Sequence, residues 1–349
     1  MAKAFSALLA ITVLSLAAWQ YVRLTQFEKD VHYHHYERCK RFEVGLEIVD
    51  MTRFGDISLA LASDGGVYSV HGLVYGRPVF NKVPIAGAPS GFQMHPLGFF
   101  LHRNATLYVL SQAGNKTEVV LLELDEAGET VSAWLNSSFA LPSHLHGTVT
   151  DLIAFENSEI YLSQTYAVPQ SGSALDSAQH IAHELLGLES TFVHHCNYTA
   201  TPVTCRALNN TLAVSVTGIA MNKFGSYFVS FATADTNWVN VYERKRNGDF
   251  SFVQKVPLRD RTEKIDHDLL HQRTYGGAVP FPYAAPGASG VVELTTWEMR
   301  SYHTYRNLVM QDGALLKGAT CAARGQANIM VASRTEKAVL VCPIYASFI

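Results

Sequence analysis

Three carboxylates, Asp56, Asp151 and Asp266, stand near the start of repeated β-prone segments of the chain. If these segments surround a common axis, the carboxylates approach one point from several sides. Oxygen donors arranged in this way suit a hard cation such as calcium, which takes about six to eight of them. The alternative interpretation is that each Asp caps a turn, a common use of this residue in loops.

Two other chemistries were weighed for the same positions. His95, Asp266 and His267 offer imidazole and carboxylate groups that suit zinc or iron, but Thr150 and Thr217 would complete such a site with hydroxyl groups alone. A nucleophilic serine on a G-x-S-x-G elbow is absent, since "GAPSG" and "GASG" have a different spacing and are typical of loops. The sequence therefore favours calcium.

The elements that would position these residues are repeated units. Six similar segments, spaced roughly 40 to 67 residues apart, begin at Gly55, His95, Thr150, Thr217, Asp266 and Ala319. Each has two apolar, β-prone runs around a turn, and several are followed by a second hairpin such as "VNVYERKRNGDFSFVQ". Four strands at this period predict a β-propeller blade, so we expect an all-β, six-bladed propeller over residues 39–349.

One segment has helical spacing instead. From Ser173 to Leu188, apolar residues fall on one face, whereas the polar face carries His180 and Glu184 and lacks Lys and Arg. A helix that binds anionic lipid usually carries basic residues. We expect an amphipathic helix over 173–188 that packs over the tunnel mouth or against a partner, with membrane insertion as the alternative.

The first residues and the sequons point to a membrane-bound, luminal or extracellular protein. An apolar run from Ala4 to Val22 predicts a signal anchor or transmembrane segment over 1–26, with a cleaved signal peptide as the alternative, and 27–38 as a linker. His32, His34 and His35 lie in this linker, where an interfacial role is favoured over a metal site. Glycosylation is expected at five acceptor asparagines: Asn104, Asn115, Asn136, Asn197 and Asn209.

Composition and cysteines agree with this compartment. The chain has 349 residues and a formal net charge of -3, which excludes a strongly basic nucleic-acid binder. We expect disulfides between Cys196 and Cys205, which flank a hairpin-sized loop, and between Cys39 and Cys342 near the two ends of the folded part. Cys321 is left over, and the connectivity is not fixed by the sequence alone.

From Cys39 onward the chain resembles the paraoxonase (arylesterase/lactonase) family. The resemblance rests on the N-terminal apolar segment, the end-to-end cysteines, and the motifs "MHPL", "TDLIAF", "TGIAMN" and "KAVLVC", which are collinear with family motifs over about 300 positions. It implies one structural calcium, held by Asp56, Asp151 and the Leu97 carbonyl. It also implies that His95 matches the first of two family histidines, while the second falls on Gln112.

The resemblance also implies that the catalytic calcium site of the family is degraded here. Its positions fall on Gly55, Thr150, Thr217, Asp266 and His267. Only Asp266 keeps a family ligand, and without a tight cation there is no Lewis acid to polarise an ester or lactone carbonyl. His95 is then the sole candidate catalytic residue.

These features predict a binding protein more readily than an enzyme. The chain looks like the non-catalytic, paraoxonase-like accessory proteins that assist assembly of degenerin-type sodium channels, which predicts a membrane-protein partner in the endoplasmic reticulum or plasma membrane. The rival hypothesis is a calcium-dependent lactonase or arylesterase with a rebuilt site. A carrier of lipids or other hydrophobic ligands is a third hypothesis.

Overall fold

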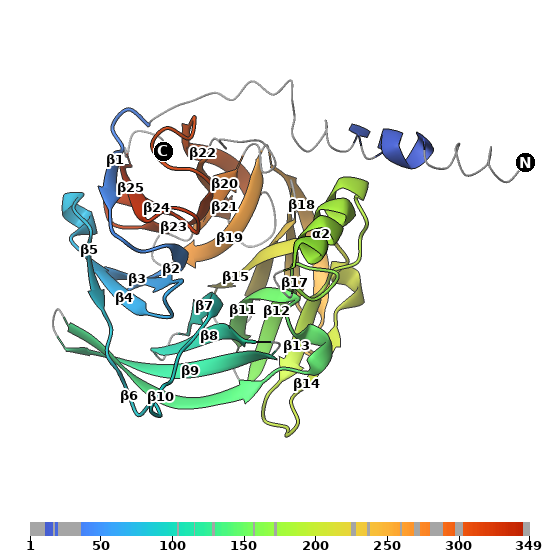
Figure 1. Ribbon diagram of the computed structural model, residues 1–349, viewed down its shortest axis with the longest axis horizontal. Coiled ribbons are helices and arrows are strands. Elements are labelled where there is room, and N and C mark those ends of the chain that lie inside the picture. The colour runs from blue at the N-terminus through green and yellow to red at the C-terminus, as the bar shows by residue number, and fades with distance from the viewer. Residues whose placement is uncertain are drawn as a thin grey trace, which may run out of the picture.

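The computed structural model describes residues 11–16, 18–19, 36–102, 105–114, 116–127, 130–155, 158–170, 173–224, 228–235, 238–258, 260–268, 273–279, 289–296 and 303–344. Within them, the strands form six sheets arranged as blades around a central axis, and the four main strands of each blade are antiparallel (Figure 1). The predicted all-β, six-bladed propeller is confirmed.

The blades follow one another along the chain. Blade 1 contains β2 (Ile48–Phe54), β3 (Ile57–Ala62), β4 (Val67–His71) and β5 (Val79–Lys82). Blade 2 contains β7 (Pro96–Leu101), β8 (Thr106–Ala113), β9 (Lys116–Ala127) and β10 (Thr130–Ala140), with the short β6 (Ile85–Ala86) parallel to β10. Blade 3 contains β11 (Val149–Phe155), β12 (Glu159–Gln164), β13 (Val193–Asn197) and β14 (Thr204–Ala207).

The second half of the ring repeats this order. Blade 4 contains β15 (Val216–Phe224), β16 (Phe228–Asp235), β17 (Trp238–Arg244) and β18 (Phe250–Pro257). Blade 5 contains β19 (Arg261–Asp268), β20 (Arg273–Val279), β21 (Ser289–Thr296) and β22 (His303–Gln311). Blade 6 contains β23 (Ala319–Arg324), β24 (Asn328–Ser333), β25 (Ala338–Pro343) and β1 (Lys40–Glu43). Three 3-10 turns, η1 (Leu73–Tyr75), η2 (Ser143–Leu145) and η3 (Asn209–Thr211), lie between strands.

The ring is closed by the two ends of the folded part. β1 is the outermost strand of blade 6 and pairs with β25, so the earliest and the latest strands of the ring lie side by side. A disulfide joins Cys39, just before β1, to Cys342 in β25. A second disulfide joins Cys196 to Cys205 across the β13–β14 hairpin, and Cys321 is a buried free thiol. Both predicted pairings are confirmed.

Apolar side chains fill the space between blades. Leu59 and Val67 of blade 1 and Leu107 and Val120 of blade 2 belong to one cluster in which all four are fully buried. Their alternation along each strand follows the period of two that places one face of a sheet toward its neighbour. This packing holds adjacent blades together.

A β-bulge interrupts each of the six innermost strands at the same place. In β2, β7, β11, β15, β19 and β23 the pairing with the second strand of the blade shifts by one residue near the start of the strand. A bulge re-aims the residues beside it. We call six residues at these bulges the axial ring: Asp50, Gly98, Asp151, Gly218 and Cys321, each the first paired residue after its bulge, and Lys264, which lies within the shift of β19 between Thr262 and Ile265.

This register corrects two of the predicted repeat units. The unit expected to begin at Gly55 is the second and third strand of blade 1, because the innermost strand is β2. The unit expected at Asp266 begins earlier, at the start of β19, near Arg261. β19 is rich in polar residues, so it lacks the apolar pattern by which the other units were recognised, whereas β2 starts with apolar residues but also contains Asp50, Thr52 and Arg53.

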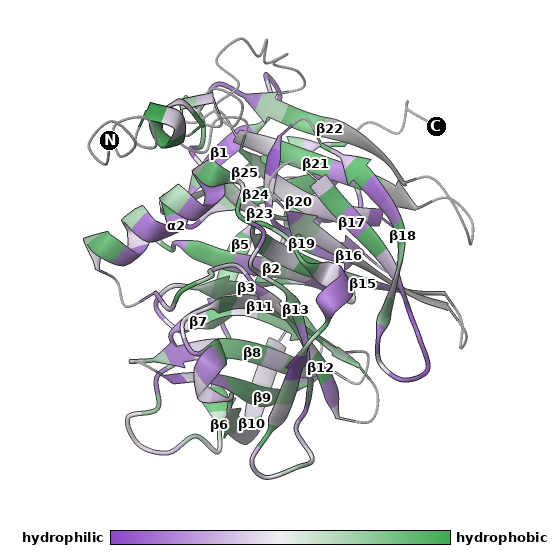
Figure 2. Cartoon of the chain, turned by 90° about the vertical axis from the view of Figure 1, so that its right-hand side faces the viewer, coloured by the Kyte–Doolittle hydropathy of each residue, from purple (hydrophilic) through white to green (hydrophobic). Residues whose placement is uncertain are grey.

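The predicted amphipathic helix is α2 (Ala174–Leu186), which stands on one face of the ring and carries both hydrophobic and hydrophilic residues (Figures 1 and 2). Ser173 caps its start, because the Ser173 hydroxyl accepts a 3.1 Å hydrogen bond from the Asp176 amide. Gly187 ends it with φ at 62°, a left-handed conformation that favours glycine.

The N-terminal predictions fall largely on residues that the structure does not describe. Residues 11–16 and 18–19 are helical, and the rest of 1–35, with His32, His34 and His35, lies outside the described residues. Among the residues that are described, no helix is long and apolar enough to cross a membrane. Asn104 and Asn115 lie outside them too, whereas Asn136, Asn197 and Asn209 are exposed.

The end-to-end disulfide generates the first prediction. Replacing Cys39 and Cys342 by Ser should lower the free energy of unfolding by up to about 5 kcal/mol in the chain-entropy model, because the bond closes a loop with a sequence separation of 303. Denaturant unfolding and secreted yield would measure this. Cys321→Ser is the control, and an equal loss in both variants would contradict a special role for the bond.

Candidate functional site

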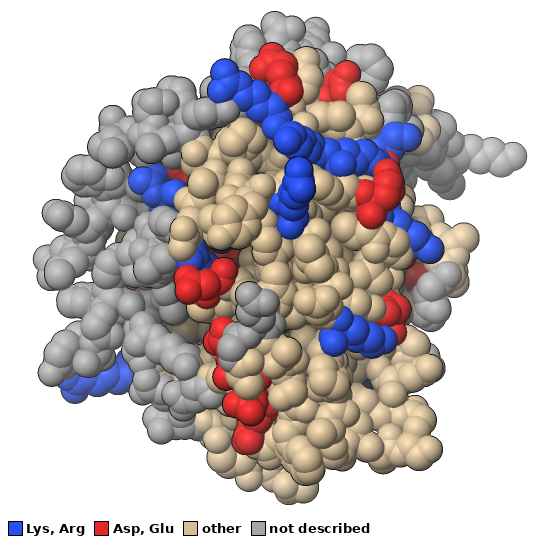
Figure 3. Space-filling model, turned by 90° about the vertical axis from the view of Figure 1, so that its left-hand side faces the viewer, with Lys and Arg blue, Asp and Glu red and all other residues tan. Residues whose placement is uncertain are grey.

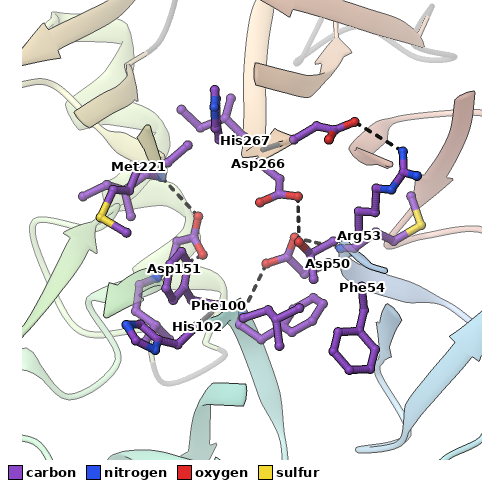
Figure 4. Close-up of a pocket in the computed structure, with 18 of the residues that line it drawn as sticks. Asp50, Arg53, Phe54, Phe100, His102, Asp151, Met221, Asp266 and His267 are labelled. Atoms are coloured by element: carbon purple, nitrogen blue, oxygen red, sulfur yellow. Dashed lines mark hydrogen bonds and ion pairs between the residues drawn. The ribbon is translucent and has the colours of Figure 1, made fainter. Parts of the chain in front are cut away.

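A cavity of about 620 Å³ lies inside the ring, between the inner strands (Figure 4). It extends from Asp50 and Asp151 in the axial ring to Gly55 and Asp56 on the exposed β2–β3 turn, and so it opens on the face where the inner strands end. Helix α2 contacts the other ends of these strands, because its Glu184 forms an ion pair with Arg261 at the start of β19. The two faces of the propeller therefore differ in construction.

Aromatic and aliphatic side chains form much of the cavity wall. Phe54, Phe100 and Phe155 come from the inner strands of blades 1, 2 and 3, and Met221 comes from blade 4. These residues lie at or close to the ends of their strands, where the ring meets solvent. An apolar wall with a few polar groups is the usual form of a small-molecule site.

Polar side chains from blades 1 and 5 line the opposite part of the cavity. The Thr52 hydroxyl donates a 2.8 Å hydrogen bond to Asp266 Oδ2, and Nη1 of Arg53 lies 3.8 Å from Asp268 Oδ2. His267 Nδ1 lies 2.9 Å from the Thr274 hydroxyl. Figure 4 shows Asp266 and Asp50 on the same side of the cavity, facing Asp151 across it.

The axial ring contains a buried charge cluster centred on Lys264. Its ammonium nitrogen lies 3.2 Å from Asp151 Oδ1 and 4.0 Å from Asp50 Oδ2, and it donates a hydrogen bond to the Thr150 carbonyl. All three charged side chains are at most 8% exposed. Gly98 completes the arrangement, because a Cβ at this position would lie only 2.4 Å from the Lys264 nitrogen.

The two carboxylates also connect neighbouring blades. Asp50 Oδ2 accepts a 3.2 Å hydrogen bond from the Phe99 amide, which joins blade 1 to blade 2. Asp151 Oδ2 accepts a 3.1 Å hydrogen bond from the Ile219 amide, which joins blade 3 to blade 4 in the same way. A buried carboxylate needs such donors. Burying a neutral polar group without a hydrogen bond costs roughly 2 to 7 kcal/mol, and burying an ionised carboxylate without one costs more.

Burial shifts the titration of these acids. Loss of hydration raises the pKa of Asp50 to about 8, although Lys264 opposes the shift. Burial raises the pKa of Asp151 as well, against the same opposing charge. Asp266 is half-buried in the cavity wall, and the loss of hydration there raises its pKa to about 7, against the Thr52 hydrogen bond.

At the starts of the inner strands, polar side chains hold blades to one another and to helix α2. The Thr217 hydroxyl donates a 2.8 Å hydrogen bond to the Thr262 carbonyl of blade 5. Arg261 lies 2.5 Å from Glu184 of α2 and 3.0 Å from Glu263. Burial alone would raise the pKa of Glu184, but the neighbouring charge of Arg261 outweighs this effect, and the pKa is lowered.

Thr150 is committed in the same way. Its hydroxyl shares a hydrogen bond with the Thr165 hydroxyl, which donates in turn to the Val216 carbonyl of blade 4 at 2.8 Å. The Thr150 carbonyl accepts from Lys264. Together with Thr217, this residue therefore links three successive blades at the start of their inner strands.

The structure separates the residues that the sequence had grouped. Asp151 belongs to the axial ring, Asp56 lies on the exposed β2–β3 turn, and Leu97 is the extra residue of the bulge in β7. His95 is exposed just before β7 and does not line the cavity, whereas Asp266 and His267 do. Gln112 bonds to the Gly114 and Gln170 carbonyls.

The bulges show which residues correspond between blades. The pair Thr150–Asp151 of blade 3 corresponds to Val49–Asp50 of blade 1, so the blade-1 pair expected at Gly55–Asp56 is displaced by six residues along the chain. In blade 5 the corresponding pair is Glu263–Lys264 and not Asp266–His267.

These contacts do not fit a calcium ion in the axial ring. Within the described part of the chain, no three His, Cys, Asp or Glu side chains are grouped to hold a metal. The position between Asp50 and Asp151 where such an ion would sit is occupied by the Lys264 ammonium. A cation beside an ammonium group is repelled by it, and Lys has no lone pair to donate when charged.

Sequence reasoning missed Asp50 and Lys264. A usable signal existed for Asp50, because "IVDM" in β2 and "VTDL" in β11 share an Asp at the same place after an apolar start. No comparable signal identified Lys264, since a single Lys in a polar strand is far more often at the surface. Its role depends on the register of the bulge, which the sequence does not reveal.

Comparisons with known proteins bear on the fold alone. No family model matches the chain, and no curated protein matches it. It is similar to the PQQ-bound aldose sugar dehydrogenase from Streptomyces coelicolor, with a TM-score of 0.50 and 9% identity over 90% of this chain and 100% of that one. It is also similar to the calcium structure of Trichoderma reesei Carbohydrate-Active Enzymes Family AA12, with a TM-score of 0.50 and 10% identity over 91% and 99%.

These identities are too low to transfer an activity. Both similar structures cover nearly the whole chain, and they support a propeller fold on which enzymes are found. The resemblance to the paraoxonase family stays a prediction from the sequence.

The raised pKa of Asp266 generates a prediction for pH dependence. The pKa of the Asp266 carboxyl is about 3.9 in the unfolded chain and about 7 in the fold. Its contribution to the free energy of unfolding is therefore complete below about pH 3.9 and is lost as the pH rises toward about 7. Asp266→Asn removes this loss. The difference in Tm between variant and wild type should therefore become more positive as the pH rises from about 4 to about 7.

Thermal unfolding at several pH values would measure the effect. Asp56→Asn, on the exposed turn, is the matched control, and its Tm should stay close to that of the wild type at each pH. A Tm difference for Asp266→Asn that is independent of pH would contradict the assignment.

Proposed function

We propose that the chain is a paraoxonase-like propeller that works as an accessory or assembly factor for a membrane protein, and not as a calcium-dependent lactonase or arylesterase. The proposal rests on the contacts of three residues. The hydroxyls of Thr150 and Thr217 take part in hydrogen bonds that link neighbouring blades, and Glu263 forms an ion pair with Arg261. At the positions where such a hydrolase needs cation ligands, this chain uses its side chains for structure.

The fixed position of helix α2 supports a binding role. Glu184 is almost fully buried against Arg261, so that side of the helix is occupied by the propeller. Leu175 and Ile181 of the same helix are 66% and 40% exposed, and Leu188 just after it is 44% exposed. Exposed apolar residues on a helix that is held in place by the rest of the fold are typical of a protein-interaction surface.

Charge supports a protein or membrane partner and not a nucleic acid. The side of the molecule that carries blade 1 presents acidic and basic groups of both signs, with a wide area of other side chains between them (Figure 3). The formal net charge of -3 agrees with this mixture. A binder of nucleic acid would instead gather Lys and Arg on one face.

The partner test uses the full chain coexpressed with a candidate membrane protein, such as a degenerin-type channel subunit. Leu175→Ser combined with Ile181→Ser should reduce copurification and the surface level of the channel at least several-fold, because the change removes the exposed apolar groups without touching Glu184. Val253→Ser, which replaces a 44% exposed residue on β18, is the matched control. Equal copurification of both variants would count against α2 as the contact.

The enzyme test uses the purified chain with lactone and aryl ester substrates. We expect no turnover above the uncatalysed rate, with or without added calcium, because the positions that correspond to the catalytic site are structural. Turnover that His95→Gln abolishes would overturn the non-catalytic proposal.

One observation favours a second candidate function, a hydrolase that needs no metal. Asp266, with a pKa raised by burial to about 7, stands beside His267 in a cavity large enough for a small ester. A carboxyl with such a pKa is suited to general acid–base catalysis near neutrality. Turnover that is lost in Asp266→Asn and kept in His95→Gln would support this candidate.

A further inference from the structure

We propose that the Lys264 ammonium group stands in the place of a metal ion, in an oxygen-lined divalent-cation site of the axial ring. Shortening this side chain should therefore convert the ring into a calcium site. The inference concerns the axial ring and does not depend on the proposed partner or on any catalytic activity. It follows from the donor atoms around the ammonium group, from the charge balance and from the space available.

The atoms around the ammonium group are oxygen donors of the kind that calcium binds. They are a carboxylate oxygen of Asp151 at 3.2 Å, a carboxylate oxygen of Asp50 at 4.0 Å and the main-chain carbonyl of Thr150. Hard cations select carboxylate and carbonyl oxygens and complete their shell with water. The donors come from blades 1 and 3, while the cation comes from blade 5, so they meet only in the closed ring.

The charge balance leaves room for a doubly charged ion. Asp50 and Asp151 carry two carboxyl groups, against which Lys264 supplies one positive charge. A divalent ion would compensate both carboxylates, as buried ions in proteins require.

The space around the ammonium group is kept free by a glycine. A Cβ on Gly98 would lie 2.4 Å from the Lys264 nitrogen, 2.7 Å from the Thr150 carbonyl oxygen and 2.8 Å from Asp151 Oδ1. All three atoms therefore surround one small volume beside the Gly98 backbone. Without the ammonium group this volume is bounded by oxygen atoms on several sides, which is the form of a cation site.

The experiment compares wild type, Lys264→Ala and Lys264→Met. Lys264→Ala empties the volume, so we expect a lower Tm in chelator and a saturable rise of several degrees with millimolar calcium, because an ion that binds only the native state stabilises it. Lys264→Met loses the same charge but keeps an unbranched side chain in the volume, so it should be destabilised without a calcium response. The Tm of the wild type should be the same in chelator and in calcium.

Direct binding gives a second readout. Titration calorimetry of Lys264→Ala with calcium should show one site per chain, and adding Asp151→Asn should weaken that binding at least about tenfold, since a carboxylate ligand is lost. Lys255→Ala, which removes a Lys that stacks on Trp238 in blade 4, is the control for loss of one positive charge and should bind no calcium.

The outcomes are decisive even if Lys264→Ala does not fold in chelator. Refolding from denaturant with calcium present should then recover the native protein, whereas magnesium, which demands a smaller and more regular shell, should recover less. A Lys264→Ala variant that neither binds calcium nor refolds in it would overturn the proposal. So would a saturable calcium stabilisation of the wild type that Asp151→Asn abolishes, because the site would then already hold a metal.

Discussion

The burial of one ammonium group between two carboxylates is the constraint on which the rest of the ring depends. Asp50 and Asp151 each accept an amide hydrogen bond from the next blade, and they can serve in this way because Lys264 supplies a positive charge at the same depth. A buried carboxylate without a cation would lose this function, since burial disfavours its charged form. Three blades thus contribute one ionisable side chain each to a single cluster, and its hydrogen bonds hold their inner strands in register.

The blades and the axial residues differ in how far the sequence determines them. The apolar pattern of segments such as "DLIAF" and "EIYLS" predicted blades, their number and the approximate position of the inner hairpins of blades 3 and 4. The two disulfides and helix α2 were also predicted correctly, because cysteine positions and helical spacing are local signals. Blade packing follows from period-two patterns that are visible without a structure.

The candidate site was less predictable, for a physical reason. Residues that face the axis of a ring are chosen by their contacts across it, and those contacts join residues more than 100 positions apart, as with Lys264 and the Thr150 carbonyl. The polar strand β19 and the mixed strand β2 were therefore not recognised as innermost strands, and the assigned residues Asp56, Asp266 and His267 were displaced along the chain from the axial ring. Asp151 was placed correctly because its strand is apolar on both sides of it.

The closure of the ring by β1 has a consequence for biosynthesis. β1 is among the first strands to be synthesised and β25 is the last, so β1 has no partner until the rest of the propeller exists. Cys39 likewise stays a free thiol until Cys342 has been synthesised, whereas Cys196 and Cys205 can form their disulfide as soon as their hairpin has been made. During this interval the nascent chain exposes an unpaired sheet edge and a reactive thiol, both of which invite wrong partners. Closure of the ring is therefore a late step of folding, because it needs strands from both ends of the propeller.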